Sequence, residues 1–144
     1  MANITDTKQT KILIVEDSEI ARLTLSLMLQ SLGYKKIDTA STGEEAVNMA
    51  SEISYDLIFM DIGLPGIDGI EATTQIRSRS AIKPPIAKNS DVVIIAATGH
   101  AKDTCEQQCF AAGMNGVIAK PFNKEELKEL LDKYIFKSNE TNKK

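Results

Sequence analysis

With 144 residues, the chain is about one domain long, which is enough for a single well-formed core. Its 42% hydrophobic and 26% charged residues are ordinary for a globular protein. No apolar stretch approaches the roughly 20 residues of a membrane helix. The first ten residues contain no apolar core of a signal peptide. The net charge of −3 argues against non-specific binding to nucleic acid, so we expect neither membrane insertion nor direct nucleic-acid binding.

The first half of the chain alternates between apolar, β-rich runs and segments with helical spacing. The helical spacing of the first helix stops at Gly33, a typical residue just after a helix. Thr42 and Glu45 have the spacing of a capping box and open the second helix. The expected elements are a strand over 11–15, a helix over 18–32, a strand over 35–39, a helix over 42–53 and a strand over 56–60.

The second half continues the alternation. Asp68 with Glu71, and later Asn123 with Glu126, have capping spacing at the start of a helix. Residues 79–91 are polar and contain prolines, which predicts an exposed loop. The expected elements are a helix from 68 to about 78, a strand over 92–97, a helix over 101–112, a strand over 116–119 and a helix over 123–136.

Strands that alternate with helices predict one domain of the α/β class over residues 11–136. The central strands are apolar throughout, as in a parallel sheet covered by helices on both faces. Right-handed crossovers then give a doubly wound, five-stranded, three-layer α/β/α sandwich. We expect residues 1–10 to be a flexible segment and the polar tail over 137–144 to be disordered.

The cysteines indicate a reducing compartment, which we take to be the cytoplasm. Cys105 and Cys109 are too few for a disulfide framework, and the single histidine, His100, leaves them without partners for a metal site. We therefore expect buried or inert thiols.

Reactive side chains follow four of the predicted strands at or just beyond their carboxyl ends. Ligands of open α/β sheets bind at that edge. Three acids, a hydroxyl and an ammonium gathered there describe a metal-assisted phosphoryl site. These side chains are Glu16 and Asp17 after KILIV, Asp61 at the end of DLIFMD, Thr98 in VVIIAATG, and Lys120 in GVIAKP.

Each of these residues also has an ordinary structural explanation. Asp17 or Ser18 is a plausible cap of the first helix. Taken alone, Asp61 fits a turn, Thr98 fits a strand and Lys120 fits a solvated surface. Their joint occurrence at successive strand ends favours the functional interpretation.

The chain resembles the receiver domain of two-component response regulators over residues 11–136. The resemblance implies the flavodoxin-like strand order 2-1-3-4-5. It also implies a cis peptide bond before Pro121. The residues that carry it are Glu16-Asp17, Asp61, Thr98 and Lys120-Pro121, with LPGIDGIE after the acceptor.

The resemblance also implies a role for each site residue. Asp61 is the nucleophile that takes a phosphoryl group from a phosphohistidine. Thr98 and Lys120 contact the transferred phosphoryl oxygens, Lys120 as a point charge. Apart from this self-phosphorylation and slow autodephosphorylation, no enzymatic activity is expected.

A divalent cation is needed because Glu16 and Asp17 add negative charge around Asp61. Mg²⁺ fits as a hard, octahedral ion that carboxylates and waters hold, and Mn²⁺ is an acceptable substitute. The resemblance implies that the backbone carbonyl of Gly63 is a further ligand.

Other classes fit less well. A phosphatase of the haloacid-dehalogenase type needs a second Asp two residues after the nucleophile, where this chain has Gly63. A flavin-binding module of the same fold needs a phosphate cradle where Glu16 and Asp17 would repel a phosphate. The main alternative is a stand-alone regulator that binds a target protein when phosphorylated.

Two departures from the family pattern bear on how the domain works. Glu16 stands where Asp is commoner. Val117 stands where many receivers carry an aromatic residue whose rotation reports phosphorylation, so an aromatic switch is absent.

The phrase AAGMNGVIAKPF resembles receivers of hybrid sensor kinases, which relay phosphoryl groups. We expect a histidine kinase or a histidine phosphotransfer protein as partner, and a monomer, with a phosphorylation-dependent dimer left open.

The first predicted helix carries two apolar stripes, although burial on a sheet needs only one. Ile20, Leu23 and Leu27 then form an exposed strip, either scattered surface hydrophobicity or a docking site for a helical bundle that bears the phosphohistidine. The stripe assigned to the core is Ala21, Leu25, Met28 and Leu32.

Overall fold

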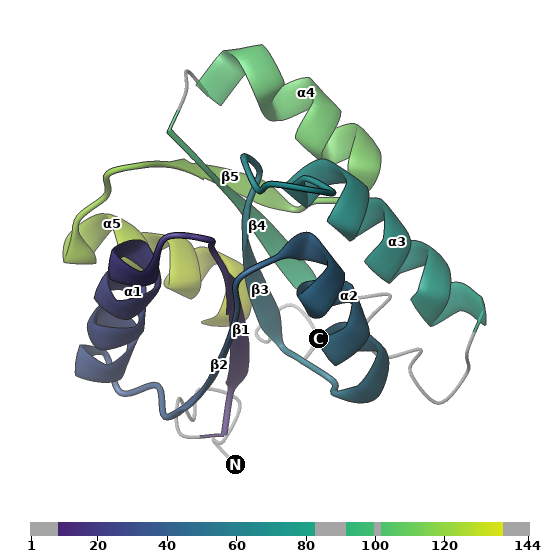
Figure 1. Ribbon diagram of the computed structural model, residues 1–144. Helices are drawn as coiled ribbons and strands as arrows, with labels where there is room; N and C mark the ends of the chain where they lie inside the picture. The colour runs from purple at the N-terminus through teal and green to yellow at the C-terminus, as the bar shows by residue number, and fades with distance from the viewer. Residues whose placement is uncertain (1–8, 83–91, 100–101, 137–144) are drawn as a thin grey trace, which may run out of the picture.

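The computed structural model describes residues 9–82, 92–99 and 102–136, in which strands and helices alternate (Figure 1). A π-helical turn, Asp132–Phe136, continues the last helix. The elements are β1 (Lys11–Val15), α1 (Glu19–Ser31), β2 (Lys36–Ala40), α2 (Gly43–Glu52), β3 (Leu57–Asp61), α3 (Gly69–Ile82), β4 (Val93–Thr98), α4 (Lys102–Ala112), β5 (Gly116–Ala119) and α5 (Lys124–Leu131).

The five strands form one parallel sheet in the order β2-β1-β3-β4-β5, which confirms the predicted α/β sandwich and its strand order. The register pairs Val15 with Met60, Asp61 with Ala97, and Thr98 with Ala119. The strands therefore end together, and the loops that follow them meet at one edge of the sheet.

Two apolar cores hold the three layers together. Alternate residues of β1 and β3, such as Ile14 and Phe59, pack with α1 and α5. Their neighbours Val15 and Met60 pack in the other core, with α2, α3 and α4. Figure 1 shows the same division, with α1 and α5 on one side of the sheet.

Local hydrogen bonds start four of the helices, including α3, where Asp68 Oδ1 accepts from the Glu71 amide at 2.9 Å as its spacing predicted. The Ser18 hydroxyl accepts from the Ala21 amide at 3.2 Å and caps α1. The capping box predicted at Asn123 and Glu126 is complete. The one predicted at Thr42 is only half formed, because the Glu45 carboxylate accepts from the Ser41 amide instead of the Thr42 amide.

Two helix ends differ from the prediction. Helix α3 continues to Ile82, so the predicted loop over 79–91 is wrong for its first four residues. Arg and Ser are tolerated in helices, so these residues do not end the helix. The first helix-breaking residue in the sequence is Pro84, because a proline disfavours helical backbone angles for the residue before it. The last predicted helix changes from α to π at Asp132. In the π turn the Tyr134 hydroxyl donates to a main-chain carbonyl of the α4–β5 loop at 3.1 Å, a contact that periodicity does not reveal.

Several predictions fall on other parts of the chain. The tail over 137–144, most of the N-terminal segment, the rest of the 79–91 loop and His100 lie outside the described residues. Cys109 is fully buried, as predicted, and the side chain of Cys105 is not described. Across the described helices, none has the length and apolar character needed to cross a membrane.

Candidate functional site

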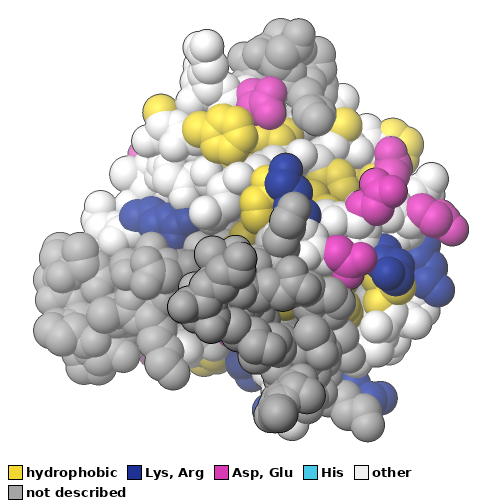
Figure 2. All heavy atoms as spheres, turned by 180° about the vertical axis from the view of Figure 1, so that it is seen from behind, with side chains coloured by type: hydrophobic (Ala, Val, Ile, Leu, Met, Phe, Trp, Pro, Cys, Tyr) yellow, Lys and Arg dark blue, Asp and Glu magenta, His cyan; other side chains and the backbone are white. Residues whose placement is uncertain are grey.

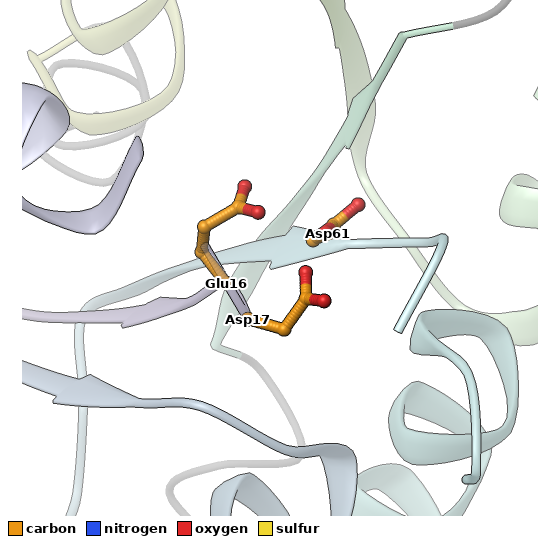
Figure 3. Close-up of side chains that lie close together, drawn as sticks. All are labelled: Glu16, Asp17 and Asp61. Atoms are coloured by element: carbon orange, nitrogen blue, oxygen red, sulfur yellow. The ribbon is translucent and has the colours of Figure 1, made fainter. Parts of the chain in front are cut away.

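Three carboxylates gather where β1 and β3 end. Glu16, Asp17 and Asp61 each offer an oxygen, and these oxygens lie within 4.8 Å of one another. Figure 3 shows the three side chains around one space at the sheet edge. Glu16 and Asp61 are each only 7% exposed, whereas Asp17 is exposed. The predicted convergence of the three acids is therefore present.

Lys120, which follows β5, lies against two of these acids. Its Nζ is 3.1 Å from Glu16 Oε1 and 3.5 Å from Asp61 Oδ1. Strand alternation explains the meeting, because residues 16, 61 and 120 continue the rows of β1, β3 and β5 that face α1 and α5. The peptide bond between Lys120 and Pro121 is cis, as predicted.

The charges in the cluster shift one another's protonation. Burial is the largest influence on Glu16 and raises the pKa of its carboxyl, the Lys120 hydrogen bond opposes the rise, and the Asp61 charge adds to it. Burial alone would lower the pKa of Lys120, but the hydrogen bond to Glu16 and the negative charges of Asp61 and Glu16 together raise it. Lys120 is therefore held as a cation between two acids.

The β3–α3 loop fixes the Asp61 carboxylate. The Gly63 amide donates to Asp61 Oδ1 at 3.0 Å. Gly69, the first residue of α3, packs so closely on the end of β3 that an added Cβ would meet the Asp61 carbonyl oxygen and lie 2.8 Å from Ile62 Cα. Gly69 had no predicted role. Its only local signal was the Asp68-Gly69 pair at the helix start.

Thr98 and Gly99 lie at the end of β4. The Thr98 residue is 1% exposed, and its main-chain carbonyl accepts from the Lys120 amide at 2.7 Å, which ties the ends of β4 and β5 together. A Cβ on Gly99 would have no neighbour within 4 Å. Val117 is half-buried against the core under α2, α3 and α4.

The donor set fits a hard divalent cation. Carboxylate oxygens are among the ligands that Mg²⁺ prefers, and one or two of them usually share the ion with waters and phosphate oxygens. Ser18 caps α1, so Asp17 is not needed as the cap. Among the described residues no cation pairs with the exposed Asp17 carboxylate, which leaves it available for an ion.

An α/β sheet with this acidic cluster and a lysine at its carboxyl edge defines a domain suited to metal-assisted phosphoryl transfer. Comparison with known families agrees, because the model of the response regulator receiver domain matches residues 12–132. The chain belongs to this family, and it is a receiver domain of two-component and phosphorelay signalling.

Relatives with this domain include hybrid histidine kinases. Hybrid signal transduction histidine kinase B of Dictyostelium discoideum is 40% identical over 124 residues, a match that covers 83% of this chain. The chain spans only 6% of the length of that kinase.

Solved structures are similar over most of the chain. The receiver domain of a sensor histidine kinase from Pseudomonas aeruginosa, with magnesium coordinated in its active-site cleft, has a TM-score of 0.76 and 37% identity, covering 88% of this chain and 97% of that one. A complex of the Saccharomyces cerevisiae histidine phosphotransfer protein Ypd1 with the receiver domain of Ssk1 gives a TM-score of 0.78 and 30% identity, covering 89% and 90%.

Proposed function

We propose that this receiver takes a phosphoryl group from a phosphohistidine onto Asp61 and relays it. The observation that carries the proposal is the Asp61 carboxylate, fixed by Gly63 and flanked by Lys120 at 3.5 Å. An Asp61 oxygen forms a bond to phosphorus while the bond between phosphorus and the imidazole nitrogen breaks, and the imidazole leaves with that electron pair.

The other site residues neutralise and orient the transferred group. Lys120 contacts the phosphoryl oxygens as a point charge, and Thr98 donates its hydroxyl to them. Glu16, Asp17, Asp61 and the Gly63 carbonyl would hold Mg²⁺ or Mn²⁺. The ion, when bound, supplies positive charge to the phosphoryl oxygens. The magnesium in the similar Pseudomonas domain supports this assignment.

The proposal describes a relay component and not a separate enzyme. Loss of the phosphoryl group to water returns the same carboxylate, so no other substrate is turned over. Val117 in place of an aromatic residue favours relay over a stand-alone regulator that exposes a new surface for a target. We also propose that the protein is a monomer in the cytoplasm and makes no direct contact with nucleic acid. Figure 2 shows basic side chains lying among acidic ones on the described part of one face.

Incubation with acetyl phosphate and Mg²⁺ tests the proposal. The intact mass should rise by one phosphoryl group, because a small donor needs no partner surface. Chelation of the metal by EDTA should prevent the gain, since the carboxylates would then repel the anionic donor. A protein that gains no mass at saturating Mg²⁺, while still folded by circular dichroism, would rule the proposal out.

The partner surface lies on α1. Ile20, Leu23 and Leu27 are 78%, 58% and 54% exposed, as the sequence predicted for this strip. The predicted core stripe is only partly right: Leu25 is buried, but the other deeply buried residue is Leu29, one turn further on, and the rest of the stripe is half-buried. The buried arc is thus rotated slightly away from the expected one.

A groove lies beside this strip, against other residues of α1. Its volume is about 400 Å³, and it runs between α1 and the loop that follows β5. Glu16 and Lys120 also line it, so it reaches the site itself. A helix seated on the strip and groove would carry its histidine close to Asp61. The remaining lining residues are Ala21, Thr24, Leu25, Met28, Ala97, Pro121 and Phe122.

We expect Leu23→Glu to slow transfer to or from a histidine phosphotransfer protein at least about tenfold, because a charge would lose hydration in an apolar interface. Labelling by acetyl phosphate should stay unchanged, since Leu23 is exposed and away from the acids. Rapid-mixing assays with radiolabelled partner measure the transfer, and intact mass measures the labelling by acetyl phosphate. Phe110→Glu is the matched control, an exposed apolar residue on α4 that should affect neither reaction. Equal transfer by the Leu23 and Phe110 variants would refute docking at the strip.

A further inference from the structure

Arg22 holds the main chain beside the acidic cluster. Its guanidinium Nη1 donates to the carbonyl of Glu16 at 2.9 Å, in a partly buried hydrogen bond. The Glu16 amide donates to the Ala40 carbonyl at 3.0 Å. The main chain of Glu16 is therefore tied to β2 through its amide and to α1 through its carbonyl.

The Glu16 carboxylate is held as well. Lys120 Nζ lies 3.1 Å from Oε1, and the Ser18 amide lies 3.4 Å from Oε2. All four polar groups of Glu16 thus have partners. Arg22 supplies the only one of them that comes from a side chain of α1.

The carbonyl that Arg22 binds belongs to the planar peptide unit joining Glu16 to Asp17. Fixing this carbonyl fixes the plane, and with it the direction in which the chain presents the Asp17 side chain. Asp17 is exposed and has no cation of its own among the described residues, so main-chain geometry has to aim it.

We propose that Arg22 is a positioning residue of the divalent-cation site, and this rests on the proposed function. It orients the peptide between Glu16 and Asp17 so that both carboxylates face the space beside Asp61. Outer partners of this kind change metal affinity by about 10- to 100-fold in other metal sites.

The charge of Arg22 and its hydrogen bond should have opposite effects on Mg²⁺ affinity, so the direction of the change in a variant tests the proposal. A guanidinium on the main chain of Glu16 repels a cation that comes to the adjacent site, so removing its charge alone would tighten Mg²⁺ binding. Loss of the hydrogen bond would loosen the Glu16–Asp17 segment and weaken binding. Arg22→Met removes both while keeping most of the aliphatic stem.

The experiment is calorimetric titration of the unphosphorylated protein with Mg²⁺. We expect roughly tenfold weaker binding for Arg22→Met. Arg22→Lys should recover part of it, because its ammonium keeps the charge and can donate one hydrogen bond. In acetyl phosphate labelling, Arg22→Met should raise the Mg²⁺ concentration for half-maximal rate and leave the rate at saturating Mg²⁺ nearly unchanged. A general structural defect would not produce this split.

Arg77→Met is the matched control. Arg77 on α3 donates to the Gly113 carbonyl at 2.6 and 3.1 Å, before β5 and thus at the opposite edge of the sheet. It should leave Mg²⁺ affinity unchanged. Asp17→Asn is the reference for a lost ligand and should weaken binding more than Arg22→Met does.

Unchanged or tighter binding by Arg22→Met overturns the proposal, provided that wild type binds Mg²⁺ and Asp17→Asn weakens it. If Arg22→Met does not fold, Arg22→Leu also removes both the charge and the hydrogen bond and carries the same test of sign. A wild-type protein that binds no Mg²⁺ would instead refute the metal site of the proposed function, and with it this inference.

Discussion

Asp61→Asn should abolish labelling by acetyl phosphate, to below the detection limit of intact mass spectrometry. The amide lacks the anionic oxygen that attacks phosphorus, while its carbonyl oxygen can still take the place of Oδ1, the one oxygen that the Gly63 amide and Lys120 both contact, so the loss should reflect chemistry and not a changed fold. In wild type the added group should be acid-labile, as expected of an acyl phosphate.

The matched control for this loss is Asp56→Asn, at the other end of the same strand. The Asp56 carboxylate accepts from the Lys11 amide at 2.8 Å, so its role is structural. Its replacement should cost some stability and leave labelling intact. Labelling of Asp61→Asn at the wild-type level would place the acceptor elsewhere.

Much of the fold followed from local signals in the sequence. The strands β1 and β3 could be recognised as buried parallel strands because their residues from Ile12 to Val15 and from Leu57 to Met60 are all apolar. In the structure every one of these residues is buried. Caps such as Asn123 depend on contacts three residues apart, which spacing reveals. The convergence of the acids needed only the rule that parallel strands end at a common edge.

The missed features depend on contacts far apart in the sequence or on three-dimensional fit. Lys120 reaches Glu16 across 104 positions, and no local pattern shows which acid it prefers. Gly69 is required by the approach of its Cα to β3, and Arg22 by a carbonyl whose direction is set by tertiary structure. Glu16 stands where Asp is commoner in the family, and in the structure its carboxylate pairs with Lys120.

Because Lys120 pairs with Glu16, Lys120→Met should change the rate of phosphorylation and the affinity for Mg²⁺ in opposite directions, and it should also change stability. Phosphorylation by acetyl phosphate should slow roughly 100- to 1,000-fold, as when a preorganised donor to a developing charge is removed. Mg²⁺ should bind more tightly than in wild type, because the cation that now neutralises Glu16 and Asp61 is gone. The fold should lose stability without metal, since two carboxylates that are each 7% exposed lose their partner, and Mg²⁺ should restore part of it.

Labelling rates, calorimetry and thermal unfolding with and without Mg²⁺ separate these effects. Lys128→Met is the control, because Lys128 pairs with Asp132 at 3.2 Å on the exposed surface of the last helix, where an ion pair contributes little. It should change none of the three measurements. A Lys120→Met protein that labels at the wild-type rate would show that Lys120 serves only to balance the acids before the metal arrives. Slow labelling combined with tighter Mg²⁺ binding would instead separate the role of Lys120, on the transferred group, from that of Asp17, on the ion.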